Sequence, residues 1–274
     1  MSNLTIYKHN DLIENFIFNA TELELQILNY AVATTNPKWE NKNLIYRIST
    51  SDLVAVYKTK SNNSYHHYSK AFDRLMKRNY SFYIDDEKKI KRTENVVIRV
   101  DENASENWFE FKFNEYISQR ISNLQGLFTK YDINHIAMFK SRYAFILYEF
   151  FIMRLKQLQN GASKYSQTIT VETFKENLDL SEKYKRFNDL EKFVLDAAKK
   201  NINKHSNIRI YYEVIRKGRT PTHLKFIAQF KKGQEPDSVE FQDELPLVEE
   251  SKVHPDAIKA KAKGILANIK AGIF

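Results

Sequence analysis

The sequence predicts an α+β fold in which one arrangement of elements occurs twice in tandem. In each copy a helix with one apolar and one basic face runs into a β-hairpin with a basic tip, near residues 65–113 and again near 184–230. The helix-spaced apolar positions are Tyr68, Ala71, Phe72, Leu75 and Met76 in the first copy, and Phe187, Leu190, Val194, Ala197 and Ile202 in the second. Each helix is therefore expected to pack on one side and to present positive charge on the other.

The elements around the first basic helix follow the order helix, strand, helix, helix, sheet. Thr21-Glu22-Leu23-Glu24 is a capping box that opens a helix ending near Pro37. The further predicted elements are a strand at 44–48, a helix from Ser49 to about Tyr57, and strands at 81–84, 96–100 and 109–113, with a charged tip at 85–89. This order is that of a winged helix.

The second half repeats the order. Residues 132–158 contain a long helix, and the predicted elements after it are a strand at 168–169, a short helix at 170–180, the basic helix at 184–203 and a hairpin at 208–230 tipped by Arg216-Lys217-Gly218-Arg219. We therefore predict two tandem winged-helix domains, residues 1–125 and 126–233, related by a pseudo-two-fold repeat. Residues 234–274 are expected to form an acidic linker and a short amphipathic helix.

Positive charge is concentrated in the predicted winged helices. The chain has 43 Lys and Arg against 34 Asp and Glu, for a formal net charge of +9. Five of those basic and eight of those acidic residues fall in 234–274, which leaves residues 1–233 with a net charge of +12. Such a surplus is typical of proteins that bind nucleic acid, and a positive helix on a packed base is the shape that enters a DNA groove.

Several other classes of protein are disfavoured by the sequence. It contains no cysteine, so disulfides and zinc-thiolate sites are excluded, and the N-terminus resembles no signal peptide. No apolar stretch approaches the roughly 20 residues of a membrane helix. The six glycines form no phosphate-binding loop, and adjacent His66 and His67 would point in different directions on a helix without a third ligand. We expect a cytoplasmic, non-enzymatic protein without metal, cofactor or membrane partner.

A set of short motifs resembles one known family. The motifs are Gly126-Leu127-Phe128-Thr129-Lys130-Tyr131, Ser141-Arg142-Tyr143, Leu147-Tyr148-Glu149, Tyr184-Lys185-Arg186-Phe187 and Lys217-Gly218-Arg219. In this order and spacing, over about residues 5–231, they resemble the initiator replication proteins of iteron-containing bacterial plasmids. The resemblance implies a protein that binds repeated double-stranded DNA sites (iterons) at the plasmid origin as a monomer. It also implies repression of its own promoter by a homodimer bound to an inverted repeat, and contacts with the host replication initiator, helicase and chaperones.

The resemblance also implies which residues contact DNA. In the second domain they are the helix residues Lys185, Arg186, Lys192 and Lys199 and the wing residues Arg216, Lys217, Gly218, Arg219 and Thr220. The first domain is expected to contact the DNA backbone and to form the dimer. Its DNA-contacting residues are Lys70, Arg74, Lys77 and Arg78. Phe193 stands where close relatives can place Arg. Asp189 and Asp196 would repel phosphate, and we expect them to orient Arg186, Lys192 or Lys200 by pairing at i±3 or i±4.

Two other functions and one candidate binding peptide are considered from the sequence. A transcriptional regulator built from two winged helices would bind a lone operator palindrome. A replication nickase would need a strand with two histidines flanking one apolar residue, and the sequence lacks this pattern. In the acidic segment, Gln242, Leu245 and Leu247 have the spacing of a peptide that docks on the replication sliding clamp, although Val248 replaces the preferred Phe. An acidic linker without a partner is the alternative.

Overall fold

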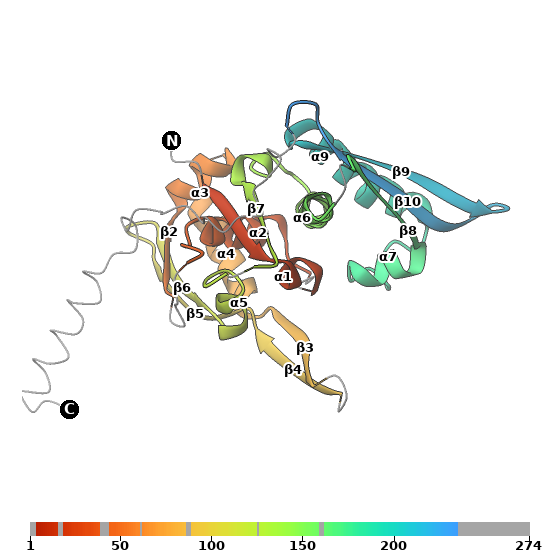
Figure 1. The fold of residues 1–274 in the computed structure, drawn as a ribbon. Coiled ribbons are helices and arrows are strands. Elements are labelled where there is room, and N and C mark those ends of the chain that lie inside the picture. Colours follow the sequence, from red (N-terminus) through yellow and green to blue (C-terminus); the bar gives the residue numbers. More distant parts are fainter. Residues whose placement is uncertain are drawn as a thin grey trace, which may run out of the picture. The chain divides into compact units, whose positions relative to one another are not determined.

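The computed structural model describes residues 4–15, 19–38, 44–60, 62–85, 89–124, 126–158 and 162–234 (Figure 1). Apart from Gln234, the predicted linker and tail helix at 234–274 lie outside the described residues, and this range includes Gln242, Leu245 and Leu247. Residues 86–88 of the first charged tip also lie outside the described residues. The described elements follow the predicted order twice along the chain.

The first half of the described chain alternates short helices with strands. Its elements are β1 Thr5–His9, α1 Asn10–Asn15, α2 Glu22–Ala33, β2 Tyr46–Ser49, α3 Thr50–Tyr57, α4 Ser64–Met76, β3 Asn79–Asp85, β4 Ile90–Asn95, β5 Val97–Asn103, β6 Trp108–Phe113 and α5 Glu115–Gln119. Strands β2, β6 and β5 form an antiparallel sheet in that order, and β3 pairs with β4 in a separate two-stranded sheet. The helix α4 is the predicted basic helix, and it packs on β5 and α2.

Side-chain caps begin the first helices where the sequence predicts. The Thr21 hydroxyl accepts the Glu24 N–H, and the Glu24 carboxylate accepts the Thr21 N–H, which confirms the capping box. Ser49 caps α3 by accepting the Asp52 N–H at 3.1 Å. Four predicted apolar positions of α4, Tyr68, Ala71, Phe72 and Leu75, are buried, and the fifth, Met76, is partly buried against the core. Phe72 stacks on Phe109 of β6 with ring centroids 4.5 Å apart, which joins the helix to the sheet.

The first hairpin differs from the prediction. The sequence pattern predicts no strand between the charged tip at 85–89 and the strand at 96–100, but β3 turns back into β4 there, and the chain then continues into β5, which pairs with β6. Strand β4 has the sequence IKRTEN, and nearly all of it is exposed. A strand without a buried face has no alternation of apolar and polar residues, so its sequence carries no signal of period two.

The second half contains the longest strands. Its elements are β7 Phe128–Asp132, η1 Ile133–His135, α6 Arg142–Lys156, β8 Lys164–Thr170, α7 Val171–Asn177, α8 Phe187–Leu190, the π-helical turn η2 Glu191–Asp196, α9 Ala197–His205, β9 Ile208–Lys217 and β10 Thr220–Phe230. β10 lies between β8 and β9 in an antiparallel sheet, and β9 and β10 form the predicted hairpin, which extends beyond the helices in Figure 1. The predicted long helix is α6, which lies within residues 132–158, and the 3-10 turn η1 precedes it.

The second basic helix begins three residues later than predicted. The consecutive segments α8, η2 and α9 make one helical stretch from Phe187 to His205, and Arg186 is its extended N-cap. Tyr184 has a left-handed backbone with φ of 51°, which a helix interior does not allow. The wider π-helical turn also shifts the buried side of the helix. Leu195 and Ala198 are buried, whereas the sequence places Ala197 in the apolar stripe.

Two contacts join the start of the chain to its middle. Strand β1 pairs antiparallel with β7, from Thr5 opposite Asp132 to His9 opposite Phe128. Lys8 of β1 forms an ion pair with Glu149 of α6, with Nζ and Oε1 2.6 Å apart. Contacts therefore cross the boundary expected between residues 125 and 126, and the exact division of the chain into domains stays a prediction.

The fully buried Glu24 carboxylate holds α4 against α2. It lies 2.6 Å from Arg74 Nε and 3.0 Å from Arg78 Nε. Glu24→Gln is expected to lower the free energy of unfolding by about 2 kcal/mol, because it removes charge-assisted hydrogen bonds from a buried site.

A urea titration followed by circular dichroism measures this change in stability. Glu22→Gln is the matched control, since Glu22 on the same helical turn lies 3.9 Å from Lys140 and its side chain is 29% exposed. A pair of this kind contributes at most about 1 kcal/mol. Equal effects of the two substitutions would contradict a special role for Glu24.

Candidate nucleic-acid interface

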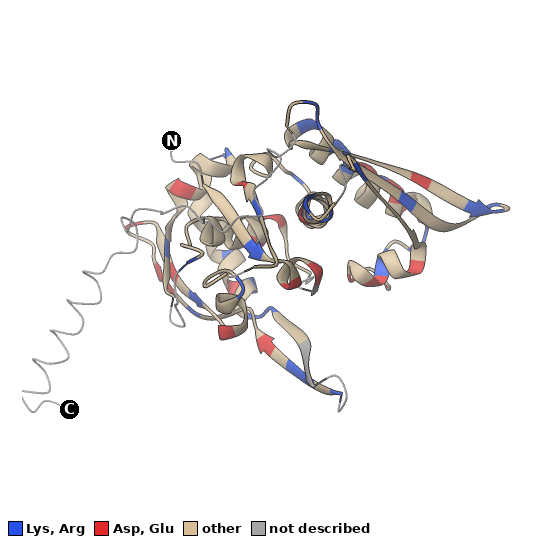
Figure 2. Ribbon diagram, in the orientation of Figure 1, with Lys and Arg blue, Asp and Glu red and all other residues tan. Residues whose placement is uncertain are grey.

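The basic side chains expected to contact DNA in the second winged helix lie largely in solvent. Lys185, Arg186 and Lys192 are exposed and Lys199 is partly buried. All five wing residues from Arg216 to Thr220 are exposed, and Figure 2 shows basic residues at the turn of the β9–β10 hairpin. The helical stretch 187–205 and the hairpin turn therefore offer two positively charged elements.

Arg186 is held at the beginning of the helix by Asp189. Its Nε donates to Asp189 Oδ2 at 2.8 Å, and its Nη2 donates to Oδ1 at 3.2 Å. The side chain of Arg186 is nevertheless 82% exposed. The predicted pairing at i, i+3 is thus confirmed for Asp189. A two-point contact fixes the plane of the guanidinium and leaves its other N–H groups available to an acceptor in solvent.

Asp196 has different partners from those that the sequence suggests. Its carboxylate accepts a hydrogen bond from the Tyr212 hydroxyl at 2.7 Å and lies 3.2 Å from Lys199 Nζ. Although burial raises the pKa of Asp196, the hydrogen bonds from Tyr212 and Lys199 outweigh it, and the pKa lies below its ordinary value. Asp196 therefore remains ionised and ties the helix to β9 through Tyr212.

The hairpin turn is connected to the start of the helix. The Arg216 guanidinium lies 5.5 Å from the centre of the Phe187 ring, and Arg216 Nη1 donates to the Arg219 carbonyl at 3.3 Å. Gly218 occupies the turn with φ of 62°, a left-handed backbone that favours glycine. The contact between Arg216 and Phe187 places the wing beside the N-terminal end of the basic helix.

The four basic residues expected to contact DNA in the first winged helix fall into two pairs. Lys70 and Lys77 are not engaged by Glu24 and reach solvent. Arg74 and Arg78 both contact Glu24. Lys70 and Arg74 lie on α4, and Lys77 and Arg78 directly follow it. The regular spacing of the four residues does not reveal this difference, because the buried carboxylate belongs to another helix.

An aromatic side chain, that of Phe193, is exposed next to the basic residue Lys192. Phe193 is 50% exposed, and its ring stacks against that of Tyr184 with centroids 6.4 Å apart. The sequence marks Phe193 only as a departure from close relatives. Its position off the apolar stripe of the helix is the signal that separates it from the core aromatics.

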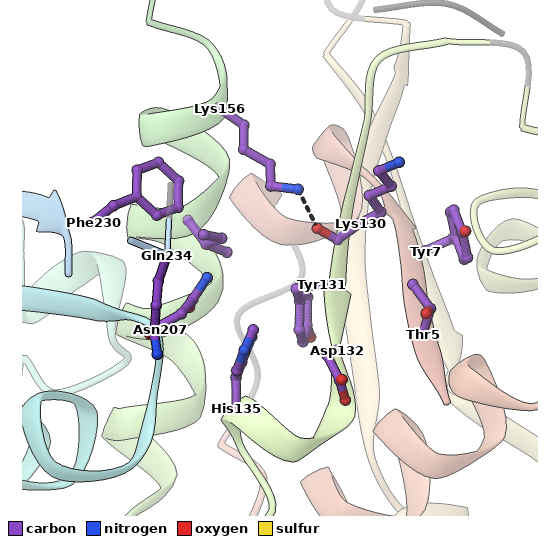
Figure 3. Close-up of a pocket in the computed structure, with 11 residues that line it drawn as sticks. Thr5, Tyr7, Lys130, Tyr131, Asp132, His135, Lys156, Asn207, Phe230 and Gln234 are labelled. Carbon is purple, nitrogen blue, oxygen red and sulfur yellow. Dashed lines mark hydrogen bonds between the residues drawn. The ribbon is translucent and has the colours of Figure 1, made fainter. Parts of the chain in front are cut away.

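A pocket of about 280 Å³ lies between β1 and β7 on one side and α6 and the end of β10 on the other (Figure 3). Lys156 of α6 donates to the Lys130 carbonyl of β7 at 2.7 Å. His135 Nδ1 and Asn207 Oδ1 lie 3.1 and 2.9 Å from the hydroxyl of Tyr148. These polar groups join α6 to the segments around it, and we assign them to the packing of that helix.

Two other kinds of site are not found within the described residues. In that part of the chain no three His, Asp or Glu side chains come together in a way that could bind a metal ion. None of the helices described there has both the length and the apolar character needed to cross a membrane.

The repeated elements define a protein with two winged-helix domains. The family model described as "Initiator Replication protein, WH1" matches residues 5–152, and the model described as "Initiator Rep protein, WH2" matches residues 170–228. The chain therefore belongs to the family of initiator replication proteins. This confirms both the predicted α+β fold with two winged helices and the resemblance to plasmid replication initiators.

Individual relatives agree with the family assignment. A replication initiation protein of Escherichia coli is 26% identical over 229 residues, which cover 82% of this chain and 70% of the relative. The crystal structure of the Pi initiator protein in complex with iteron DNA superimposes with a TM-score of 0.69 and 21% identity, covering 85% of this chain and 99% of that one. At this identity the likeness shows a common fold.

The stability of the protein is expected to fall in mild acid, in part because of His135. Burial lowers the pKa of His135, and Lys156 and Lys231 act in the same direction against the opposing charge of Asp132. Below about pH 6.5 the unfolded chain therefore binds a proton that the folded protein takes up only at lower pH. The free energy of unfolding decreases as the pH falls through this window.

His135→Gln should reduce this pH dependence while keeping a polar side chain near Tyr148. Thermal unfolding at about pH 7.5 and about pH 5.5 measures the difference in melting temperature. His9 and His205 also have a pKa lowered by burial, so part of the dependence should remain in the variant. An unchanged difference would exclude a contribution from His135.

Proposed function

We propose that this protein initiates plasmid replication by binding iterons in double-stranded DNA as a monomer. The main support is that a basic helix and a basic hairpin turn, joined by Arg216 and Phe187, are exposed together in a chain of the initiator replication protein family. The similar Pi initiator was crystallised in complex with iteron DNA. The helix 187–205 enters the major groove in this proposal, and the wing contacts the neighbouring phosphates.

The first winged helix has a separate role in the proposal. Lys70 and Lys77 contact the DNA backbone, with Arg74 and Arg78 supporting them from their sites beside Glu24. The same domain forms a homodimer that binds an inverted repeat and represses the gene's promoter, since a two-fold protein matches a palindrome. Host replication initiator, helicase and chaperones are the proposed protein partners. The protein acts by binding and performs no chemical step.

Sequence-specific binding should depend on the second basic helix. Arg186→Ala and Lys192→Ala are each expected to weaken binding about tenfold to hundredfold, the effect of removing one contact to a base edge. The probe is a duplex enriched by the full-length protein from a random-sequence library, measured by fluorescence anisotropy at fixed salt. Lys164→Ala, which removes one exposed charge from β8, is the control.

The selected sequence also tests the biological role. We expect it to recur as direct repeats of about two helical turns in the DNA that flanks the gene. A lone palindrome would indicate a transcriptional regulator instead. Wild-type affinity in both helix variants would overturn the assignment of the interface.

Contacts by the first winged helix should be independent of DNA sequence. The double variant Lys70→Ala and Lys77→Ala is expected to weaken binding to selected and unrelated duplexes alike. The slope of log affinity against log salt concentration should become shallower by about 0.9 for each phosphate that the variant no longer neutralises. Binding titrations at several salt concentrations measure the slope, and an unchanged slope would mean that these lysines only face solvent.

A further inference from the structure

An aromatic side chain is exposed on the second basic helix, beside its charged residues. Phe193 lies in the π-helical turn η2, next to Lys192, and half of its surface is exposed. The following residues Val194 and Leu195 are both buried, so this turn directs its apolar bulk inward except at Phe193. π-helical turns inside α-helices occur frequently at functional sites.

The ring of Phe193 has two neighbours in the folded chain. Tyr184 stacks against it at an interplanar angle of 28°, and Lys192 Nζ lies 5.2 Å from its centre. Tyr184 itself is fixed by a hydroxyl contact of 3.2 Å to Tyr143, which is buried on α6. A ring that is already ordered loses little conformational entropy when it binds a partner.

The backbone of Tyr184 supports this arrangement. Its φ of 51° is unusual for a bulky residue and is a source of strain. From this left-handed position the Tyr184 ring stacks on Phe193 of the helical stretch that follows it. Two motifs of the sequence, Ser141-Arg142-Tyr143 and Tyr184-Lys185-Arg186-Phe187, therefore meet at the contact between Tyr143 and Tyr184.

We propose that Phe193 determines specificity by contacting the 5-methyl group of a thymine in the major groove. This inference rests on the proposed function, in which the helix 187–205 lies in that groove. Phe has no hydrogen-bonding group, and among the four bases only thymine presents an apolar group at the major-groove edge. Tyr184 and Tyr143 are positioning residues that keep the ring directed outward.

Replacing thymine with uracil tests this contact, because the two bases differ only by the methyl group and pair identically. The probe is the duplex enriched by the full-length protein from a random-sequence library, with each thymine replaced in turn. At one position or a small group of positions, uracil should weaken binding of the wild-type protein about threefold to fivefold, the effect of one buried methyl group.

Two substitutions connect the effect to the ring. Phe193→Ala should bind the thymine and uracil duplexes equally, and Phe193→Leu should keep part of the preference because it retains an apolar side chain. Ile98→Ala is the matched control, since Ile98 is also 50% exposed but lies on β5. Tyr143→Phe should reduce the thymine-to-uracil ratio by loosening Tyr184, an effect that simple destabilisation would not produce.

The outcomes separate this inference from the proposed function. Failure of the library to yield any preferred sequence would overturn both. A selected sequence whose binding is insensitive to uracil, or is equally sensitive in the wild type and in Phe193→Ala, would overturn the thymine contact alone. A uracil effect that disappears with Phe193→Ala and persists with Ile98→Ala would support it.

Discussion

A largely buried ion pair near the beginning of the chain joins several elements of the fold. Lys8 Nζ lies 2.6 Å from both Glu149 Oε1 and Asn29 Oδ1, and the Tyr131 hydroxyl donates to the same carboxylate. These four residues belong to β1, α6, α2 and β7, so one buried charge pair connects the first strand with three later elements. Removal of one partner from such a pair commonly costs about 3–5 kcal/mol, because the other charge stays buried.

The helix that receives this ion pair also supports the candidate interface. α6 packs on α1, α2 and β7 and also on β8, β10 and α9. From its first turn, Tyr143 reaches the hydroxyl of Tyr184, just before the basic helix begins. The start of the basic helix is therefore fixed by the same element that connects β1 and β7 to the second sheet.

The two basic helices use their positive charges differently. Of the four cations predicted on and directly after α4, Arg74 and Arg78 neutralise a buried carboxylate and so contribute to packing. On the second helix the pairs are at the surface, where Arg186 and Lys199 contact Asp189 and Asp196 while remaining partly or largely exposed. Surface ion pairs of this kind contribute little to stability. The basic residues of the second helix can therefore replace their contacts with Asp189 and Asp196 by contacts with DNA phosphates at little cost.

Local sequence is enough to predict the class of fold, the helix caps at Thr21 and Ser49, the buried stripe of α4 and the hairpin with its turn at Gly218. Each of these features depends on residues a few positions apart, so hydrophobic periodicity or the side chains that cap helices are enough to predict it. The pairing of β4 with β3, the start of the basic helix at Phe187 and the contacts of Arg74 and Arg78 with Glu24 emerge only in the folded chain. Glu24 and Arg74 are 50 residues apart in the sequence, and Lys8 and Glu149 are 141 apart. Such pairs form only when helices and strands pack together, so the spacing of neighbouring residues does not predict them.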